Sequence, residues 1–233
     1  MRPVTAKYNA GPYIRVDFPN SMIQWGLAMM RRIASIGALT LVLMLLAAPH
    51  ATAGSDPVAF INALVTQGIQ LADANVQQAQ RTAELRDLFQ RDFDVPEIGR
   101  FVLGRYWRDI TPDQQKEFLL LFQNCMVASY SQRLGEYGDV PFHTLRVRAD
   151  GDETIVTTEF ALASGGPVQI DWHVIDESGQ YKIIDVAIDG VSMKMSLRGE
   201  FADIIQRNHG RADSILAVLR QQLTPAGGHN PYG

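Results

Sequence analysis

The sequence predicts an α+β fold, in which helices from both ends of the chain pack on one face of a curved antiparallel sheet of about four strands and enclose an apolar cavity. Apolar residues recur at helical spacing over residues 57–137 and again over 198–223, whereas residues 142–193 alternate with a period of two. With 233 residues and 46% hydrophobic content, the chain is long enough for one domain with a substantial core.

The N-terminal 53 residues are predicted to lie outside that domain. Arg31 and Arg32 precede an uncharged run, 33-IASIGALTLVLMLLAA-48, which is followed by the small-residue site 51-ATA-53. A basic start, an apolar run of this length and a small-x-small site are typical of a secretory signal peptide, with cleavage after Ala53. We therefore interpret residues 1–53 as an upstream extension plus signal peptide, with an uncleaved anchor as the alternative, residues 54–224 as a single domain, and 225–233 as a disordered tail.

The charge of the exported chain excludes a nucleic-acid partner. Removing residues 1–53 takes away five basic side chains and one acidic one, which leaves 16 basic and 24 acidic and a formal charge near −8. Nucleic-acid binding needs a basic surface, and export argues against it as well. The single cysteine, Cys125, allows no disulfide within the chain and lies in an apolar helical stretch, which favours buried packing over a reactive thiol.

Three helical segments are expected before the middle of the chain. Asp56 followed by Pro57 is a helix start, and apolar residues then recur at helical spacing to about Val76. A second, short helix is expected over 82–93. Pro96 separates it from a stretch, 94–111, in which aromatic residues alternate with arginines.

A long helix follows, from Pro112 to about Tyr137. Thr111, Pro112 and Gln114 form the pattern of a capping box with proline in the first turn. Its apolar residues form two adjacent stripes, so its apolar face is wider than packing on one side requires. This width predicts that protein or a ligand covers a second side of the helix.

The second half of the chain is expected to form an antiparallel meander. Alternating stretches run through 145–147, 156–162, 168–174 and 181–193, and short turn sequences separate them. Two helices, near 198–208 and 211–223, are predicted to follow.

Few residues carry catalytic or metal-binding patterns. The histidines have no metal-ligand spacing, and Gly190-Val191-Ser192 lacks the second glycine of a nucleophile elbow, so we expect no metal, no cofactor and no nucleophilic catalysis. Asp185 is a carboxylate among apolar strand residues and could be a tuned general base in a pocket, as in ketosteroid isomerase. A structural role for Asp185 is the favoured interpretation, and a small isomerase-like enzyme remains the alternative from a different class.

Two long motifs resemble those of the MlaC-type, or toluene-tolerance, family. The first is 104-GRYWRDITPDQQKEFLLLFQNCMVASYSQRL-134, and the second is 179-GQYKIIDVAIDGVSMKMSLRGEF-201. The similarity runs in order from about Pro57 to Leu223. Asp189 departs from the family pattern, in which glutamate is common at that place. A hopanoid-associated branch, HpnM, shares these motifs.

The resemblance implies a periplasmic carrier of Gram-negative bacteria rather than an enzyme. Such a carrier binds phospholipid and moves it between an outer-membrane lipoprotein complex and an inner-membrane MCE-type ABC transporter, which maintains outer-membrane lipid asymmetry. A hopanoid or other isoprenoid lipid is the alternative cargo. We expect a monomer.

The expected lipid site lies between the long helix and the concave sheet. Each buried CH₂ contributes about 0.8 kcal/mol, so one chain of about 16 carbons requires roughly 12 kcal/mol of shielding, which needs an enclosed pocket. The aromatic and apolar side chains that we predict to contact lipid, with ordinary core packing as the alternative for each, are Phe101, Tyr106, Trp107, Phe118, Phe122, Met126, Tyr130, Phe160, Trp172, Val174, Ile184, Val186 and Met193.

Overall fold

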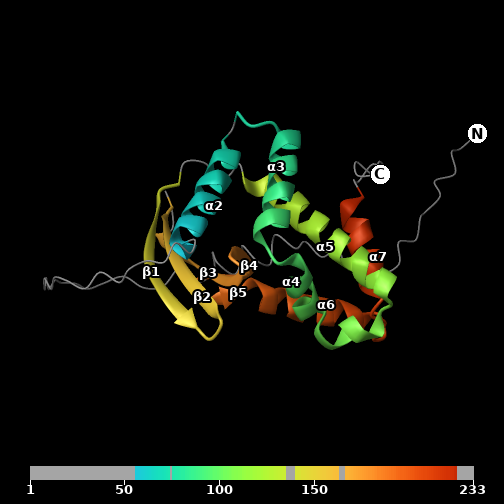
Figure 1. Ribbon diagram of the computed structural model, residues 1–233. Helices are drawn as coiled ribbons and strands as arrows, with labels where there is room; N and C mark the ends of the chain where they lie inside the picture. Colours follow the sequence, from blue (N-terminus) through green and yellow to red (C-terminus); the bar gives the residue numbers. More distant parts are fainter. Residues whose placement is uncertain (1–55, 74, 135–139, 163–165, 225–233) are drawn as a thin grey trace, which may run out of the picture.

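A computed structural model describes residues 56–73, 75–134, 140–162 and 166–224. The predicted signal peptide and the predicted tail lie outside these residues, so both stay predictions. Within them the α+β class is confirmed: the chain runs from helices to an antiparallel sheet and back to helices (Figure 1). The elements of the first part are α2 (Pro57–Ala72), α3 (Gln78–Asp92), α4 (Val95–Leu103), the 3₁₀ helix η1 (Gly104–Asp109) and α5 (Pro112–Arg133).

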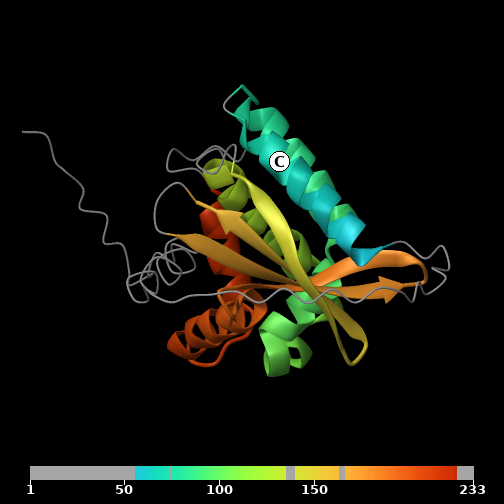
Figure 2. The ribbon, with the colours of Figure 1, turned by 90° about the vertical axis from the view of Figure 1, so that its left-hand side faces the viewer.

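The second part of the chain forms the sheet and two helices. The sheet has the order β1-β2-β3-β4-β5, with each strand antiparallel to its neighbour (Figure 2). Its elements and the helices after it are β1 (Phe142–Asp150), β2 (Glu153–Ala161), β3 (Pro167–Glu177), β4 (Gln180–Ile188), β5 (Val191–Ser192), α6 (Met193–Arg207) and α7 (Ser214–Leu223).

Both helix starts read from the sequence are present. Asp56 accepts a hydrogen bond from the backbone N–H of Val58, with Pro57 in the first turn of α2. At α5, the hydroxyl of Thr111 accepts from the N–H of Gln114, and the Gln114 side chain accepts from the N–H of Thr111. These reciprocal bonds satisfy two donors that a helix leaves free at its N-terminus.

The end of α2 is held by a residue that the sequence pattern did not single out. Arg81 of α3 is buried, and its guanidinium donates to the carbonyl oxygens of Leu71, Asp73 and Val76 at 2.7–3.1 Å. A cation among the last carbonyls of a helix stabilises that end. The same contacts order the first turn of α3, which begins at Gln78, four residues before the predicted helix over 82–93.

The predicted strand over 181–193 was wrong beyond Ile188. Asp189 and Gly190 both have positive φ (47° and 81°), so the chain turns there, β5 pairs back on β4, and α6 begins at Met193. Glycine adopts such a conformation without strain, and aspartate tolerates it better than most residues. Met193 is therefore the first residue of a helix, and α6 starts five residues before the predicted helix near 198–208.

The two faces of the sheet differ in polarity. One face carries Val156, Trp172 and Val174, which pack against α2. The other carries paired polar side chains: His173 contacts Glu153 at 2.8 Å, and Arg146 lies 3.7 Å from Asp171. Ile155, Thr157 and Asp185 share that second face and are buried, so the two faces differ in polarity more than in exposure.

The buried apolar residues divide into two main clusters rather than one. A helical cluster joins α4, η1, α5, α6 and α7, and a sheet cluster joins α2 and α3 with β2, β3 and β4. A third, small cluster of Leu71, Leu85 and Val127 links α2, α3 and α5. In Figure 1 the sheet and α2 lie on one side, α5 and α7 on the other, with α3 and α4 between them.

Candidate functional site

The helical cluster is tightly packed around Phe118. This fully buried ring stacks on Phe122 with centroids 5.8 Å apart, and it meets Phe201 and Trp107 edge to face at 6.0 and 6.3 Å. Such pairs add to the stability that their buried area provides. Of the predicted lipid contacts, Phe118, Phe122, Met126 and Tyr106 are buried in this cluster, and Trp107 packs at its edge.

The sheet cluster is less completely covered. Trp172, Val174 and Val156 are buried with α2, and the indole N–H of Trp172 donates to the Thr158 hydroxyl at 2.9 Å. Around them lies a set of partly buried apolar side chains, which we call the sheet rim. Its members are Phe60, Ile69, Phe142, Phe160, Ile170, Tyr181 and Val186.

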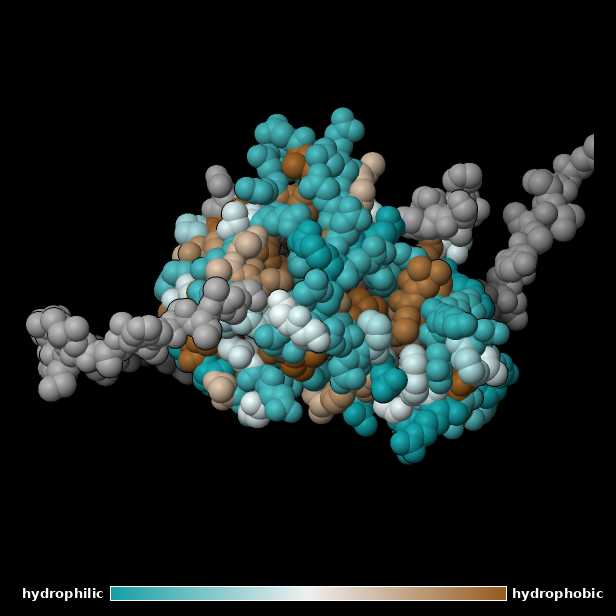
Figure 3. Space-filling model, viewed as in Figure 1, coloured by the Kyte–Doolittle hydropathy of each residue, from teal (hydrophilic) through white to brown (hydrophobic). Residues whose placement is uncertain are grey.

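Aromatic contacts extend along the sheet rim. Phe142 and Phe160 stack across β1 and β2 with centroids 5.7 Å apart, and Phe60 of α2 lies 5.8 Å from Tyr181 of β4. Figure 3 shows apolar side chains gathered between α2 and α3, beside the hydrophilic outer face of α3. Apolar surface that the fold leaves half-covered in this way marks a site for a further apolar partner.

The helical and sheet clusters meet at three aromatic residues, which we call the seam: Phe89, Phe93 and Tyr130. Phe89 packs against all three clusters, stacks on Phe93 at 4.5 Å and lies 6.0 Å from Tyr130. The Tyr130 hydroxyl donates to the sulfur of Met193 at 3.5 Å, and burial raises the pKa of Tyr130 well above its usual value. A thioether is a weak acceptor, so this hydroxyl keeps capacity for a better partner.

A bulge decides which isoleucine of β4 faces α2. The register shifts between His173 and Val174, so Ile183 pairs with Val174, while Val186 pairs with Trp172. Ile183 belongs to the sheet cluster; Ile184 is buried but is not one of that cluster's members. The structure thus brings Trp172, Val174 and Val186 together and adds Ile183, which the apolar run 183–184 could not distinguish from its neighbour.

Phe101 differs from the other predicted lipid contacts in its neighbours. Its ring lies on the partly exposed side of α4, with Lys194 Nζ at 4.9 Å and Arg198 Cζ at 5.0 Å from its centroid.

The predicted lipid contacts did not include Phe89 and Phe93 of the seam. Their four-residue spacing at the end of the predicted helix over 82–93 was the available signal, but the polar sequence of that helix gave no sign of two apolar neighbours.

Asp185 has its hydrogen-bonding capacity committed to the start of α6. The carboxylate is buried and accepts from the Ser192 hydroxyl, from the N–H of Lys194 at 3.0 Å and from the N–H of Val186 at 2.8 Å. Two of these donors belong to the N-terminus of a helix, where a negative charge is stabilised. This geometry fits a structural role. Among the described residues, no group of histidine, cysteine, aspartate and glutamate could hold a metal ion.

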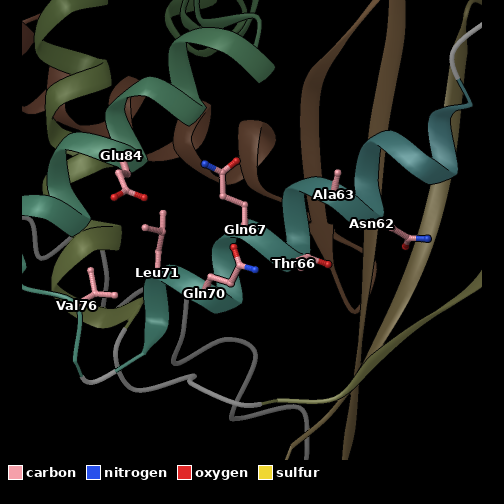
Figure 4. Close-up of a pocket in the computed structure, with 8 residues that line it drawn as sticks. All are labelled: Asn62, Ala63, Thr66, Gln67, Gln70, Leu71, Val76 and Glu84. Atoms are coloured by element: carbon pink, nitrogen blue, oxygen red, sulfur yellow. The ribbon is translucent and has the colours of Figure 1, made fainter.

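A groove of about 630 Å³ lies on the outer side of α2 and α3 (Figure 4). Five of its eight lining residues have polar side chains, and none of the predicted lipid contacts belongs to it. The lining residues are Asn62, Ala63, Thr66, Gln67, Gln70, Leu71, Val76 and Glu84. Amide and carboxylate side chains would be left without water if an acyl chain filled this groove, so the sheet rim and the seam are the better candidate lipid site.

The chain belongs to the MlaC protein family, whose model matches residues 63–221. The toluene tolerance protein ttg2D of Pseudomonas putida is 24% identical over 125 residues, which cover 53% of this chain and 58% of that protein. The intermembrane phospholipid transport system binding protein MlaC of Haemophilus influenzae is 21% identical over 131 residues, 54% of this chain and 60% of that protein. The matched regions thus span about three-fifths of the length of these relatives.

A solved structure supports the fold. The phospholipid-binding protein from Ralstonia solanacearum, in complex with a phospholipid, superposes with a TM-score of 0.62 at 19% identity and covers 72% of this chain and 97% of that one. Similarity at this level of identity establishes the arrangement of helices and sheet. In the part of the chain that the structure describes, none of the helices is both long and apolar enough to cross a membrane.

Proposed function

We propose that this protein is a periplasmic lipid carrier that holds phospholipid acyl chains between α2–α3 and the sheet. Membership of the MlaC family and the fold shared with a phospholipid-bound structure support the proposal. The observation that carries it is the division of the core: a sheet cluster bordered by half-buried aromatic side chains is joined to a larger helical cluster through the seam. A protein without cargo would gain stability by covering those rings.

The proposed carrier exchanges its cargo with an outer-membrane lipoprotein complex and an inner-membrane MCE-type ABC transporter. The name of the Haemophilus relative, which refers to an intermembrane phospholipid transport system, supports this role. Because acyl chains are equally shielded in a membrane and in such a pocket, transfer would follow docking and would need no nucleotide hydrolysis by this chain. Export through the predicted signal peptide, with cleavage after Ala53, would place the chain in the periplasm.

We further propose that the chain is not an enzyme. The isomerase-like alternative required Asp185 to act as a general base, and a general base needs an available lone pair directed at the substrate. The hydrogen bonds from Ser192, Lys194 and Val186 support a structural carboxylate instead.

Mass spectrometry of lipids extracted from the protein purified from periplasm tests the proposal. We expect about one phospholipid per chain, in line with a single enclosed site. Hopanoid or another isoprenoid lipid in that amount would retain the carrier and change the cargo. Consistently empty protein would refute the carrier function.

The position of the cargo can be tested separately. Phe89→Ala removes a ring that packs against all three clusters, so its effect on lipid content would be confounded by unfolding. Phe160→Ser changes a half-buried ring of the sheet rim, and Leu120→Ser changes a side chain on α5 that is 60% exposed, as a control. We expect Phe160→Ser to lower the retained lipid and Leu120→Ser to leave it unchanged; equal lipid content in both would place the cargo elsewhere.

A further inference from the structure

Two basic stretches that are far apart in the sequence meet beside α4. Lys194 and Arg198, one turn apart on α6, both lie over Phe101 of α4, with Nζ and Cζ at 4.9 and 5.0 Å from its ring centroid. The Arg198 guanidinium also lies against Gly104, since a Cβ added there would stand 3.0 Å from its nearest nitrogen. The close approach therefore depends on glycine at position 104.

Two further arginines extend this region along α4 and η1. Arg100 Cζ lies 6.0 Å from the centroid of Trp107, and Arg105 Cζ lies 4.7 Å from that of Tyr106. Arg105 also donates to the Tyr106 hydroxyl at 2.7 Å. We call Arg100, Arg105, Lys194 and Arg198 the cationic surface. Contacts with aromatic rings orient these cations but leave their charge in place.

The cationic surface keeps a net positive charge. None of its four members forms an ion pair with a described carboxylate, whereas Arg91 and Arg220, for example, each contact one within 4 Å. The hydrogen bond to the Tyr106 hydroxyl, and to a smaller degree the charge of Asp109, raise the pKa of Arg105. Glu97 is the acidic residue of α4, and it is exposed. Four cations in one region are notable in a chain with a formal charge of −4.

Exposed apolar side chains lie next to these cations in the sequence. Met195, which follows Lys194 on α6, is 57% exposed, and Val191, three residues before Lys194 in β5, is 41% exposed. A group of cations with a few exposed apolar side chains is the pattern by which proteins bind the surface of an anionic bilayer: the cations contact phosphates, and the apolar groups enter the headgroup region. We take the bilayer as the occupant, because it offers anionic phosphates and an apolar layer beneath them; an acidic protein partner is the alternative that a failure to bind vesicles would indicate.

We propose that the cationic surface binds the anionic face of a phospholipid bilayer, and so holds the chain at a membrane while lipid is exchanged. The inference rests on the proposed carrier function for its purpose, but the binding itself depends only on the surface. It also gives a role to the charges of Arg100 and Arg105, in addition to the contacts of these side chains with aromatic rings.

Co-sedimentation of the exported chain with vesicles tests this inference. The vesicles are phosphatidylcholine with or without phosphatidylglycerol, at low and at raised salt. We expect binding to the anionic vesicles only, weakened by salt because the contact is with exposed charges. The double substitution Lys194→Gln with Arg198→Gln should lower the binding constant by on the order of thirtyfold, since each cation near such a surface contributes roughly a fivefold effect.

Arg207→Gln with Arg211→Gln is the matched control, because it removes the same charge from exposed side chains at and just beyond the far end of α6. We expect it to leave vesicle binding nearly unchanged. Equal losses in the two double variants, no binding to anionic vesicles, or equal binding to neutral ones would overturn the inference. Circular dichroism verifies that each variant is folded.

The lipid content of the same preparations separates this inference from the proposed function. If the protein contains lipid but does not bind anionic vesicles, the proposed membrane-binding surface is wrong and the carrier function is unaffected. If the protein binds anionic vesicles through Lys194 and Arg198 but never contains lipid, the carrier function is wrong and the membrane-binding surface is supported.

Discussion

Cys125 lies between α5 and α7, where its sulfur contacts the carbonyl oxygen of Leu219 at 3.6 Å. Burial raises the pKa of the thiol from 9.0 to about 12, because the thiolate would be removed from water. The reactive form of cysteine is the thiolate, so the folded protein should have an inert thiol near neutral pH. Burial at this position was predicted from the apolar helical stretch around it.

The first prediction concerns the pH dependence that this thiol produces. Above pH 9 the unfolded chain loses the thiol proton and the folded chain does not, so stability is complete below pH 9 and falls as the pH rises from 9 towards 12. Between pH 9 and 10 the wild type should lose about 1 kcal/mol of unfolding free energy relative to Cys125→Ala, before discounting for partial exposure. Urea titrations at the two pH values measure this. Parallel pH profiles for the two proteins would contradict it.

The second prediction concerns Asp185. Asp185→Asn keeps one acceptor oxygen but removes the charge at the N-terminus of α6, so we expect a loss of about 1–2 kcal/mol of stability. The amount of copurified lipid should not change, because the carboxylate points at Ser192 and Lys194 rather than at the sheet rim. Urea unfolding and lipid extraction are the two measurements.

Asp203→Asn is the control for that variant, because Asp203 is an exposed carboxylate on α6, the helix whose start Asp185 binds. We expect it to change neither quantity by a measurable amount. If Asp185→Asn stayed fully stable but lost its lipid or its ability to exchange it, a functional role for this acid would be established instead.

At the scale of elements, the junction between α4 and η1 depends on Gly104. Its φ of +54° is unfavourable for a residue with a Cβ, and Arg198 of α6 fills the space where that atom would lie. The glycine thus lets α4 and α6 approach each other, and it positions the cationic surface.

The third prediction follows from this junction. Gly104→Ala should lower stability by about 1–2 kcal/mol, from the strained φ and from displacement of the Arg198 guanidinium. Gly68→Ala is the matched control, because Gly68 lies inside α2 and a Cβ there meets no atom within 4 Å. That substitution should stabilise the protein by roughly 0.5–1 kcal/mol. Thermal unfolding of the pair gives the comparison, and equal shifts would contradict the strain at Gly104.

Some element boundaries could be read from the sequence and others could not. The capping box at Thr111 and the start of α2 at Pro57 are local signals, made by residues that bond within one turn. The end of β4 at Ile188 is less visible, because residues 183–188 and 191–193, on the two sides of the turn, are mostly apolar. The bulge that selects Ile183 rather than Ile184 depends on pairing with β3 and has no local signal at all.

At the scale of the whole molecule, the sheet and its covering helix form one part and the α5–α7 helices another. α2 is tied to the edge of the sheet by a hydrogen bond from the Thr144 hydroxyl to the Asn62 side-chain oxygen at 3.0 Å. α5 and α7 are tied by the Arg220–Glu117 ion pair. If cargo enters between α2 and the sheet, the first contact must open and the second need not.

The fourth prediction uses this difference. In a Cys125→Ala background, Asn62→Cys with Thr144→Cys provides two thiols that a short bis-methanethiosulfonate reagent can cross-link, which holds α2 on β1 without the close Cα atoms that a direct disulfide requires. Cross-linking should then slow lipid exchange with vesicles by at least about tenfold, because the open state becomes a minor population, and reduction of the cross-link should restore it. Transfer of a fluorescent phospholipid measures the rate.

Glu117→Cys with Arg220→Cys, in the same background and with the same cross-linking reagent, joins α5 to α7 as the control. It should leave the exchange rate unchanged before and after reduction. If lipid exchange were slowed only by the link between α5 and α7, the entry route would lie in the helical part of the molecule.

The sequence by itself determined the fold class, the capped starts of α2 and α5, and the family, because periodicity, capping and long motifs are properties of neighbouring residues. It also supplied most of the apolar side chains now found in the two clusters. Only the tertiary structure decided how these side chains divide: Phe118 and Phe122 close a helical core with Phe201, while Trp172 and Val186 belong to the sheet cluster and its rim. It likewise brought Lys194 and Arg198 to Phe101 across some ninety residues of chain. The reason is physical: an apolar or basic residue carries its chemistry in the sequence, but its neighbours are set by pairings between distant segments.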